Sequence, residues 1–500
     1  MRQVKYPQLR VGETPIAKIK INLKSRDDIP PLLLGLQYIY TTVDLRRKVF
    51  AILEQQIKPG TDKKNGRPGM ELWRILVFGV LRLNLNWDYD RLIEMANNHK
   101  TIRFMLGHSS FDDDYEYKLQ TIKDNVSLLT PKILDEINVV VVEGGHNLVK
   151  KRGDIYPDTG GEEGELKGRC DSFVVETNVH YPTDINLLFD AMRKVICLVA
   201  TLCTLCNLSG WRQSKHNIKN LKRLFRKAQQ LKRSTSKDDK KKTQRDELIR
   251  AAHQEYIDTA IMFLGKVHST MEKASGGGSG AIALVFAIES FLKHAERQID
   301  QIHRRVILGE TIPHSEKVFS IFEEHTEWIS KGKAGVPVEL GLKVCVLEDQ
   351  YGFLLHHRVM EHTTDDQVAI LMIAEGKEKF PSLNSCSFDK GFHSPANQKD
   401  LLQHIDNVIL PRKGKLSLND KQREHSADFI KARHQHSAVE SAINALEVHG
   451  LDRCPDHGLL GFKRYVALAV LARNIQQLGV KIRENQLALL RQKEKFRKAA

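Results

Sequence analysis

The amino-acid sequence predicts an α+β protein: a mixed, five-stranded sheet with flanking helices, interrupted by a helical insertion and preceded by a helical N-terminal region. Two observations predict this fold class. Runs rich in β-branched and aromatic residues occur at about 170–178 and return only at 338–360, 384–388 and 407–410. Between the first and second of these runs, apolar residues recur almost wholly at helical spacing.

Residues 1–130 are expected to form the N-terminal helical region. Apolar residues at helical spacing predict a helix that Pro59-Gly60 ends, and the nearly continuous apolar run from Met70 to Leu85 predicts a second helix. Residues 87–97 predict another, short helix. Several short helices separated by turns are compatible with a helix-turn-helix that reads DNA, and equally with a plain helical bundle.

Residues 131–182 and 333–478 are expected to form the core. Thr130-Pro131 predicts the start of a helix that runs to about 150, because Thr is a good N-cap and Pro suits the first helical position. A polar loop over 153–168 and a strand around Asp171 follow. Strands at 338–347 and 353–360 are joined by the turn EDQYG and predict a hairpin. A helix at 366–374, strands at 384–388 and 407–410, and helices at 439–449 and 462–478 complete the plan of a ribonuclease-H-like core.

Residues 183–332 are expected to form the helical insertion, and 479–500 a basic tail. The formal net charge is +15, and two segments carry nearly all of it. The segment from Lys215 to Arg245 has 13 Lys or Arg against two Asp, and the segment from Lys481 to Lys498 has seven against two Glu. Concentrated cations suit contacts with phosphates, although a solvated helix face that binds nothing is the alternative.

The composition also excludes some classes of protein. No stretch approaches the roughly 18 continuous apolar residues of a membrane span. No apolar run follows the first charges, so we expect no secretion signal and a cytoplasmic protein. Seven cysteines, an odd number at scattered spacings, agree with a reducing compartment.

Three acidic residues are the candidate catalytic residues. Asp171 is expected near the start of its strand, Asp389 at the end of another and Glu440 within a helix. Carboxylates are the ligands that Mg²⁺ prefers, and two such ions about 3.5–4 Å apart serve enzymes that cut and join phosphodiesters. The sequence therefore predicts a site for two Mg²⁺ ions, for which Mn²⁺ substitutes. The alternatives are that Asp171 is a surface acid on its strand, that Asp389 initiates the turn before Gly391, and that Glu440 is a helix-surface acid. Glu447 competes with Glu440 as the third ligand.

Other candidates have simpler interpretations. Cys203 and Cys206 form a CxxC in an apolar helix with no second pair, so buried cysteines are favoured over a zinc site. His356 and His357 face opposite sides of a strand, which argues against a joint ligand role. Asp184 either supports the site or only caps its helix, for which Thr183 is also a candidate cap. The candidate DNA contacts are Lys390, Arg412, Lys413 and Lys415 after core strands, and Lys222, Arg223, Arg226 and Lys227 in the insertion.

Several segments, in this order, resemble DDE-type transposases of bacterial insertion sequences. They are GRPGMELWRILVFGVLRLNLNWDYDRLIEM, CDSFVVETNVHYPTDINLLFDAMRK, KAGVPVELGLKVCV, FDKGFHSPANQ, RHQHSAVESAINALEVHGLDRC and HGLLGFKRYVALAVLARNIQQLG. The resemblance covers most of the chain outside the insertion. It implies that Asp171, Asp389 and Glu440 form a metal-binding triad. It also implies a homodimer or higher oligomer that binds terminal inverted repeats in duplex DNA and joins their 3′ ends to target DNA, in the bacterial cytoplasm at the nucleoid.

The segment around Glu440 departs from the pattern of that family. Many relatives have a Tyr seven residues before the glutamate, an Arg four before it and a Lys seven after it, whereas this chain has Arg433, His436 and Glu447 there. These residues still share one polar helix face with Glu440, so Arg433 and His436 are also candidate DNA contacts. Two alternatives remain: a metal-dependent nuclease on the same core, and a DNA-binding protein derived from a transposase whose chemistry has lapsed.

Overall fold

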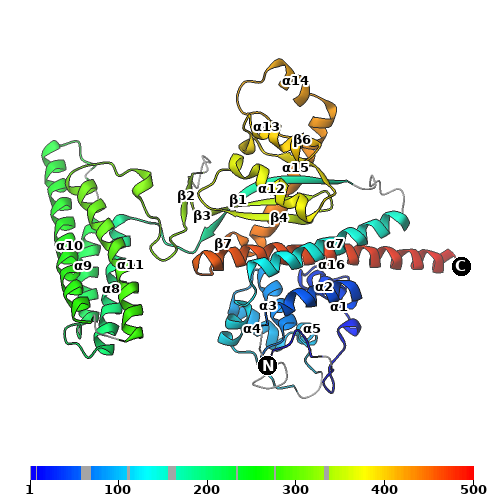
Figure 1. Cartoon of the computed structure of the whole chain (residues 1–500), viewed down its shortest axis with the longest axis horizontal. Coiled ribbons are helices and arrows are strands. Elements are labelled where there is room, and N and C mark those ends of the chain that lie inside the picture. The colour runs from blue at the N-terminus through cyan, green and yellow to red at the C-terminus, as the bar shows by residue number, and fades with distance from the viewer. Residues whose placement is uncertain are drawn as a thin grey trace. The chain divides into compact units, whose positions relative to one another are not determined.

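The computed structural model shows a mixed α+β protein that is mostly helical, with an open mixed sheet among its helices (Figure 1). It describes residues 2–6, 8–57, 69–109, 113–155, 165–231, 233, 235–274, 278–330 and 337–499. The chain divides into two compact units. The first comprises Met1–Asn178 and Ile329–Ala500, so it holds both the N-terminal helices and the sheet, and the second is Val179–Trp328.

Five strands form the centre of the sheet in the order β4-β3-β1-β5-β6. Strands β4, β3 and β1 run antiparallel, whereas β1, β5 and β6 run parallel. Their bounds are β1 Leu166–Thr177, β3 Val338–Asp349, β4 Leu354–Met360, β5 Leu383–Phe388 and β6 Asn407–Ile409. The predicted strands and hairpin are therefore confirmed.

Two short strands extend this sheet to seven, so the predicted count of five was too low. Strand β2, Glu327–Ser330, pairs with β3, and β7, Arg453–Cys454, pairs with β1. With four and two residues, neither is long enough to show the alternation by which a strand is recognised in a sequence. The position of Asp171 also differs from the prediction, because β1 begins five residues before it and Asp171 lies in the middle of the strand.

Helices cover both faces of the sheet. Successive side chains of a strand point to opposite faces. On β1, Ser172 bonds to Asp365 at the start of α12, while Ser387 of β5, on the face of Asp171, bonds to His436 of α15. Helices α12 and α15 therefore lie on opposite faces. The helices of this part are α7 Pro131–Ile155, α12 Asp365–Lys379, α13 Asn397–Asp400, α14 Leu418–Glu424, α15 Ala427–Leu446 and α16 Gly458–Ala499.

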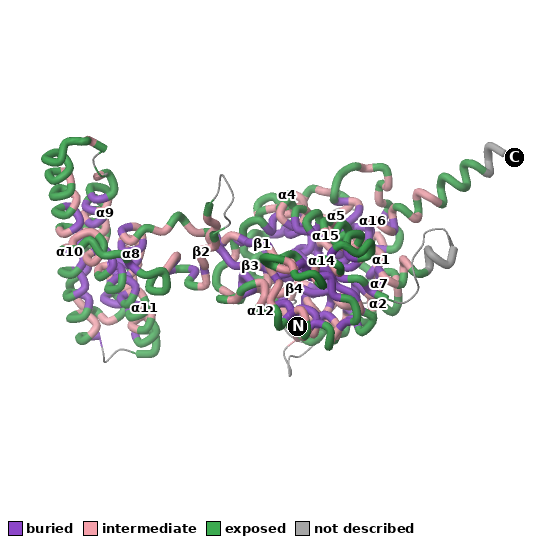
Figure 2. The backbone as a smooth tube through the Cα atoms, turned by 90° about the horizontal axis from the view of Figure 1, so that it is seen from above, coloured by how far each residue is buried: buried purple, intermediate pink, exposed green. Residues whose placement is uncertain are grey.

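The end of the chain differs from the prediction. Helix α16 runs without a break through the segment expected to be a separate basic tail, and its residues 489–495 are exposed (Figure 2). The segment from Arg483 to Lys498 contains neither Gly nor Pro and is rich in Leu, Ala, Lys, Arg, Gln and Glu. These are strong helix formers, so helix propensity explains the extension. Helix α15 likewise begins twelve residues before the predicted start, where Ser426 caps it by accepting a hydrogen bond from the Phe429 amide.

The N-terminal helices share one hydrophobic core with the sheet. Every residue of α3 except the half-buried Arg74 is buried, including Arg82, which forms an ion pair with Asp456 at 3.0 Å. Helices α1 and α16 cross so closely that a Cβ on Gly479 would lie 1.7 Å from the Pro31 carbonyl oxygen. Helix α3 is therefore a central packing element of the first unit. The helices are α1 Ile29–Thr41, α2 Val43–Glu54, α3 Leu72–Asn84, α4 Tyr89–Asn98, α5 Lys100–Met105 and α6 Leu119–Val126, and Pro59-Gly60 lies outside the described residues.

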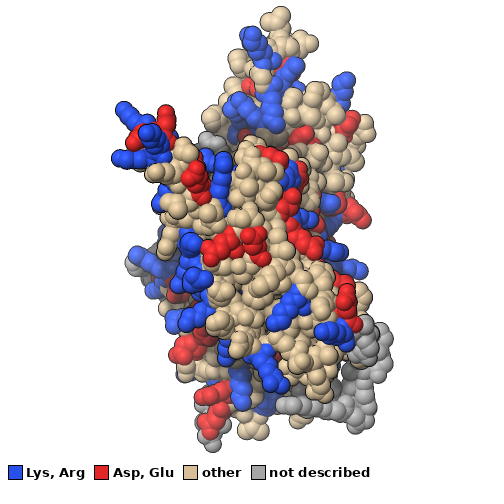
Figure 3. Space-filling view, turned by 90° about the vertical axis from the view of Figure 1, so that its left-hand side faces the viewer, with Lys and Arg blue, Asp and Glu red and all other residues tan. Residues whose placement is uncertain are grey.

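The second unit is a helical bundle with its own hydrophobic core. Its helices are α8 Asp184–Leu205, α9 Ser214–Gln230, α10 Asp239–Ala274 and α11 Ser279–Ile302. The Thr183 side chain caps α8 by accepting a hydrogen bond from the Asn186 amide, as predicted. In the view of Figure 3, Lys and Arg side chains gather along the left-hand flank.

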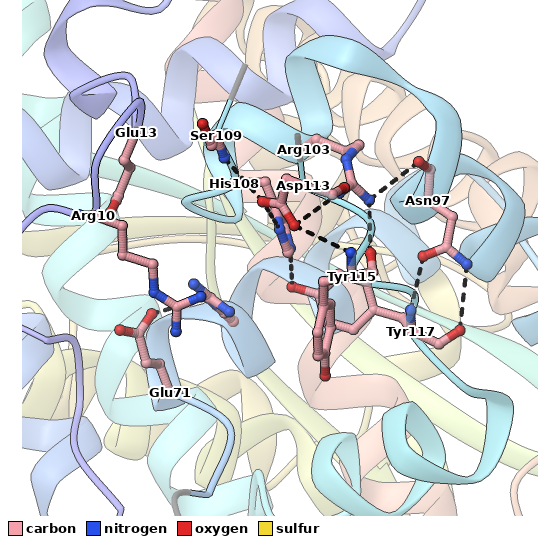
Figure 4. A network of polar contacts seen from close by, with 11 residues as sticks. Arg10, Glu13, Glu71, Asn97, Arg103, His108, Ser109, Asp113, Tyr115 and Tyr117 are labelled. Atoms are coloured by element: carbon pink, nitrogen blue, oxygen red, sulfur yellow. Dashed lines mark hydrogen bonds and ion pairs between the residues drawn. The ribbon is translucent and has the colours of Figure 1, made fainter. Parts of the chain in front are cut away.

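A polar network fixes the chain between α5 and α6 (Figure 4). The imidazole of His108 bonds through Nδ1 to Asp113 at 2.8 Å and through Nε2 to the Tyr117 hydroxyl at 2.7 Å. Arg103 donates to the backbone carbonyls of Asn97, Asp113 and Tyr115. The network ties the described parts of this connection to Arg103 of α5 and Asn97 of α4.

Candidate active site

The register of the sheet brings Asp171 and Asp389 together. Strand β1 pairs with β5 up to Cys170, which lies opposite Phe388, and pairs with β7 only from Glu176 onward. Asp171 and Asp389 each follow the last pair by one residue, so they are neighbours across the point where β5 ends. The edge of β1 between these two pairings is where the site is built.

Helix α15 brings Glu440 to the same place. It packs against β1, β3, β5 and β6. One turn before Glu440, His436 Nδ1 bonds to the Ser387 hydroxyl at 2.9 Å, which anchors the helix to β5. The negative charges of Asp389 and Glu440 act on the His436 imidazole and raise its pKa, but burial has the larger effect and the net pKa is lowered. His436 Nε2 is buried without a hydrogen-bond partner among the described residues.

These three carboxylates line one pocket of about 530 Å³ within the first unit. The pocket also contains a fourth carboxylate, Asp365, and a lysine, Lys343. Its wall is completed by residues of β1, β2, the short 3-10 helix η5 (Lys390–Phe392), the end of α15 and the turn that follows it: Ser172, Phe173, Val174, Ile329, Ser330, Phe392, Ile443, Asn444 and Glu447.

The charges in the pocket act on Asp171. Burial raises the pKa of its carboxyl most strongly, and the negative charges of Asp389, Asp365 and Glu440 raise it further. A hydrogen bond from the Ser172 amide, at 2.7 Å, works in the opposite direction. The net result is a pKa of about 6, well above the ordinary value for Asp. Such a site favours a proton or a cation that relieves the repulsion among its carboxylates.

The sequence did not point to Asp365, Lys343 or Ser172. Both oxygens of Asp365 accept from the Lys343 ammonium, at 3.2 and 3.0 Å, and its Oδ1 also accepts from the Ser172 hydroxyl at 2.7 Å. An acid in the first turn of α12, next to a capping box, is an ordinary helix-start residue in a sequence. One signal existed: Lys343 is the single charged residue in the otherwise apolar run from Leu340 to Leu347.

Glu447 lies in the pocket wall as well. It begins a one-turn π-helix, Glu447–Leu451, in which Gly450 has a φ of 105° that favours glycine. Both glutamates that compete for the third position of the triad therefore face the same pocket, although only Glu440 is among the charges that most affect Asp171.

The donor set suits a hard divalent cation, because carboxylate oxygens are what Mg²⁺ and Mn²⁺ prefer and because repulsion already raises the Asp171 pKa. The spacing is wider than a coordination shell. Among the described residues, no group of three or more His, Cys, Asp or Glu side chains is placed to hold a metal ion. The acids are gathered into one pocket, and metal binding requires them to draw closer together.

The candidate DNA contacts near the core are spread around this region and do not line the pocket. Lys390, directly after Asp389, and Lys415 are exposed. Lys413 is also exposed and donates to the Gly391 carbonyl at 2.9 Å. Arg412 forms an ion pair with Asp420, and Arg433 is exposed on α15. Lys222, Arg223, Arg226 and Lys227 lie on α9, in the second unit.

The remaining candidates make contacts of a structural kind. Asp184 pairs with Arg305 at 2.6 Å within the second unit and does not reach the pocket. Cys203 is buried and Cys206 half-buried, both as free thiols. His356 bonds to Glu375 of α12 at 2.7 Å. Burial lowers the pKa of its neighbour His357 to about 4.

Fold and site together define a mixed α+β protein with a carboxylate-lined pocket where one strand of its sheet ends. Comparisons with known protein families, with curated proteins and with solved structures found no match. No helix among the described residues has the length and apolar character that crossing a membrane requires.

Proposed function

We propose that this protein is a DNA transposase of the DDE type with a ribonuclease-H-like catalytic core. The observation that carries the proposal is the meeting of Asp171, Asp389 and Glu440 in one pocket, from two adjacent parallel strands and a helix. The order β4-β3-β1-β5-β6, with its antiparallel and parallel halves, supports the assignment of the core. Acids from three separate elements that line one pocket favour a catalytic role, because acids that only face solvent are not expected to gather in one place.

In this proposal, Asp171, Asp389 and Glu440 hold two Mg²⁺ ions, with Mn²⁺ as a substitute. The ions supply an activated oxygen nucleophile and relieve negative charge at the leaving oxygen. Asp365 holds the Lys343 ammonium at the pocket wall, where it offers positive charge to a phosphate. His436, anchored to Ser387, fixes the rotation of α15 and so directs Glu440 toward the two aspartates.

The substrates are the terminal inverted repeats of a transposon and its target DNA, and the protein acts as a homodimer or higher oligomer in the bacterial cytoplasm, at the nucleoid. The exposed lysines Lys390 and Lys415 contribute to backbone contacts beside the pocket. The repeats to use as substrate are those that flank the coding sequence.

The test uses DNA that carries these repeats, with Mg²⁺ or Mn²⁺. Asp171→Asn and Asp389→Asn are each expected to abolish cleavage and joining, and to leave binding of the repeats largely intact. Asp366→Asn is the matched control, because Asp366 neighbours Asp365 but its side chain accepts from Thr364 and does not line the pocket. Full activity in either pocket variant contradicts the proposal. Cuts without joined products identify a metal-dependent nuclease instead.

A second candidate is a DNA-binding protein whose transposase chemistry has lapsed. Two observations favour it: the acids stand wider apart than a metal site requires, and Arg433, His436 and Glu447 depart from the residues of the resembled family. Binding of the repeats by the unmodified protein, with neither cleavage nor joining in either metal, supports this candidate.

A further inference from the structure

The second unit contains a groove of about 950 Å³ between α9 and α10, which we call the α9–α10 groove. One wall is α9, whose groove-lining residues recur every three or four positions, so they form one face of the helix. The other wall is the first half of α10. The groove is lined by His216, Lys219, Asn220, Lys222, Arg223, Arg226, Lys227, Gln230, Leu231, Leu248, Ala251, Ala252 and Glu255.

The charge of this groove is strongly one-sided. Five lining residues are Lys or Arg, and Glu255 is the one acid among them. Glu255 pairs with Lys227 at 2.6 Å. Among the described residues, Lys219, Lys222 and Arg226 are exposed and have no ion-pair partner. A row of unneutralised cations along a groove is the electrostatic pattern that a polyanion recognises.

The opposite side of α9 decides which polyanion fits. A basic helix that lies on a membrane inserts its apolar face among the lipids. Here the apolar face of α9, with Leu221, Leu224 and Ala228, is already buried inside the bundle. The groove is lined by Leu248 and two alanines but by no Phe, Tyr or Trp, so it offers no broad platform for unstacked bases. The α9–α10 groove therefore suits neither a membrane surface nor a single-stranded nucleic acid.

We propose that the α9–α10 groove binds the phosphodiester backbone of double-stranded DNA. From Lys219 to Arg226 the helix advances about 10 Å, at roughly 1.5 Å per residue. One strand of duplex DNA presents a phosphate about every 3.4 Å along its axis. The row of cations therefore spans about three consecutive phosphates. Such contacts position DNA without reading its sequence.

This site lies in a different unit from the acidic pocket. It goes beyond the proposed function, because binding in the groove needs neither a divalent ion nor catalysis. Its test can therefore be made in EDTA on duplex DNA of arbitrary sequence, and its failure leaves the cleavage test untouched.

The experiment measures the affinity of the full-length protein for a fluorescent duplex of about 30 base pairs, by anisotropy, at salt concentrations between 50 and 200 mM. The double variant Lys222→Ala/Arg226→Ala removes two groove cations spaced one turn apart. The matched control is Lys293→Ala/Arg297→Ala, which removes two exposed cations with the same spacing from α11, outside the groove. Circular dichroism verifies that both variants are folded.

Log affinity falls as log salt concentration rises, and each lost phosphate contact reduces the steepness of this fall by about 0.9. The groove variant should therefore lose about 1.8 from the slope. Its loss of affinity between 50 and 200 mM salt should be about twelvefold smaller than that of the unmodified protein. The control should keep the original slope. An unchanged slope in the groove variant overturns the proposal. Equal slope losses in both variants, or binding to vesicles of anionic phospholipid that the groove variant loses while its DNA binding is unchanged, also overturn it.

Discussion

Replacing Asp171 with Asn should stabilise the metal-free protein at high pH. The pKa of Asp171 is raised from 3.8 to about 6 by burial and by Asp389, Asp365 and Glu440. The folded state therefore disfavours the ionised carboxyl. Each pKa unit corresponds to about 1.4 kcal/mol, so ionised Asp171 lowers the free energy of unfolding by up to about 3 kcal/mol. Asn removes this charge and can keep the hydrogen bond from the Ser172 amide.

The pH at which the gain appears follows from the two pKa values. Below about pH 3.8 the carboxyl is protonated in both the folded and unfolded states, so its charge costs nothing. Above about pH 6 it is ionised in both, and the full cost applies. The stability advantage of Asp171→Asn should be about 0.5 kcal/mol at pH 4 and approach about 3 kcal/mol at pH 8. Titrating groups that do not interact with Asp171 are common to both proteins and cancel in the comparison.

The assay is urea unfolding in EDTA at both pH values, followed by circular dichroism, for the unmodified protein, Asp171→Asn and Asp366→Asn. Asp366→Asn controls for the loss of one negative charge outside the pocket. Adding Mg²⁺ at pH 8 should stabilise the unmodified protein and have little effect on Asp171→Asn, since a ligand that binds only the folded state raises its stability. If the advantage of Asp171→Asn is the same at pH 4 and pH 8, the repulsion inferred for this pocket is refuted.

Two further predictions concern single residues. Glu440→Gln should lower metal-dependent cleavage by more than about 100-fold and Glu447→Gln by no more than about tenfold, because an outer residue usually costs less than a ligand; the reverse order in a cleavage assay would assign the third ligand to Glu447. Gly479→Ala should destabilise the first unit by about 3 kcal/mol or more in urea unfolding, since its Cβ would overlap the Pro31 carbonyl. Gly265→Ala, in α10 with nothing within 4 Å, should instead stabilise the second unit by about 0.5–1 kcal/mol; destabilisation of both alike would contradict the packing argument.

The strands that hold the two aspartates could be predicted from the sequence, because each depends on a local pattern. SFVVET is a short run rich in β-branched residues, SCSF alternates Ser with the apolar Cys and Phe, and the acid beside each run is visible in the chain. Parallel pairing of β1 with β5 then makes Asp171 and Asp389 neighbours. The register of this pairing is set largely by the sequence, because shifting it by one residue would turn the buried face of a strand toward solvent.

The contacts of Asp365 and Lys343 could not be predicted in the same way. Lys343 lies on β3 and Asp365 begins α12, so the two meet only when the helix has packed on its face of the sheet. The start of β1 was hidden for a local reason: Lys167, Gly168 and Arg169 interrupt the apolar pattern. A Cβ on Gly168 would come within 2.9 Å of the end of the Leu347 side chain, so the backbone is closely packed there. A glycine between two charged residues is typical of a loop in a sequence.

The geometry of α15 favours Glu440 over Glu447 as the partner of the two aspartates in the proposed site. Seven residues of α-helix advance about 10 Å, so both glutamates can face one pocket while lying far apart along the helix. Two ions that act on one phosphodiester stand only about 4 Å apart, which favours the glutamate that lies nearer to the two aspartates. The bond between His436 and Ser387 anchors α15 one turn before Glu440, beside the end of β5 that carries Asp389. The charge of Glu440 accordingly acts on Asp171. Glu447 begins the turn that leads to β7, where β1 resumes its pairing at Glu176, and so it closes the far end of the pocket.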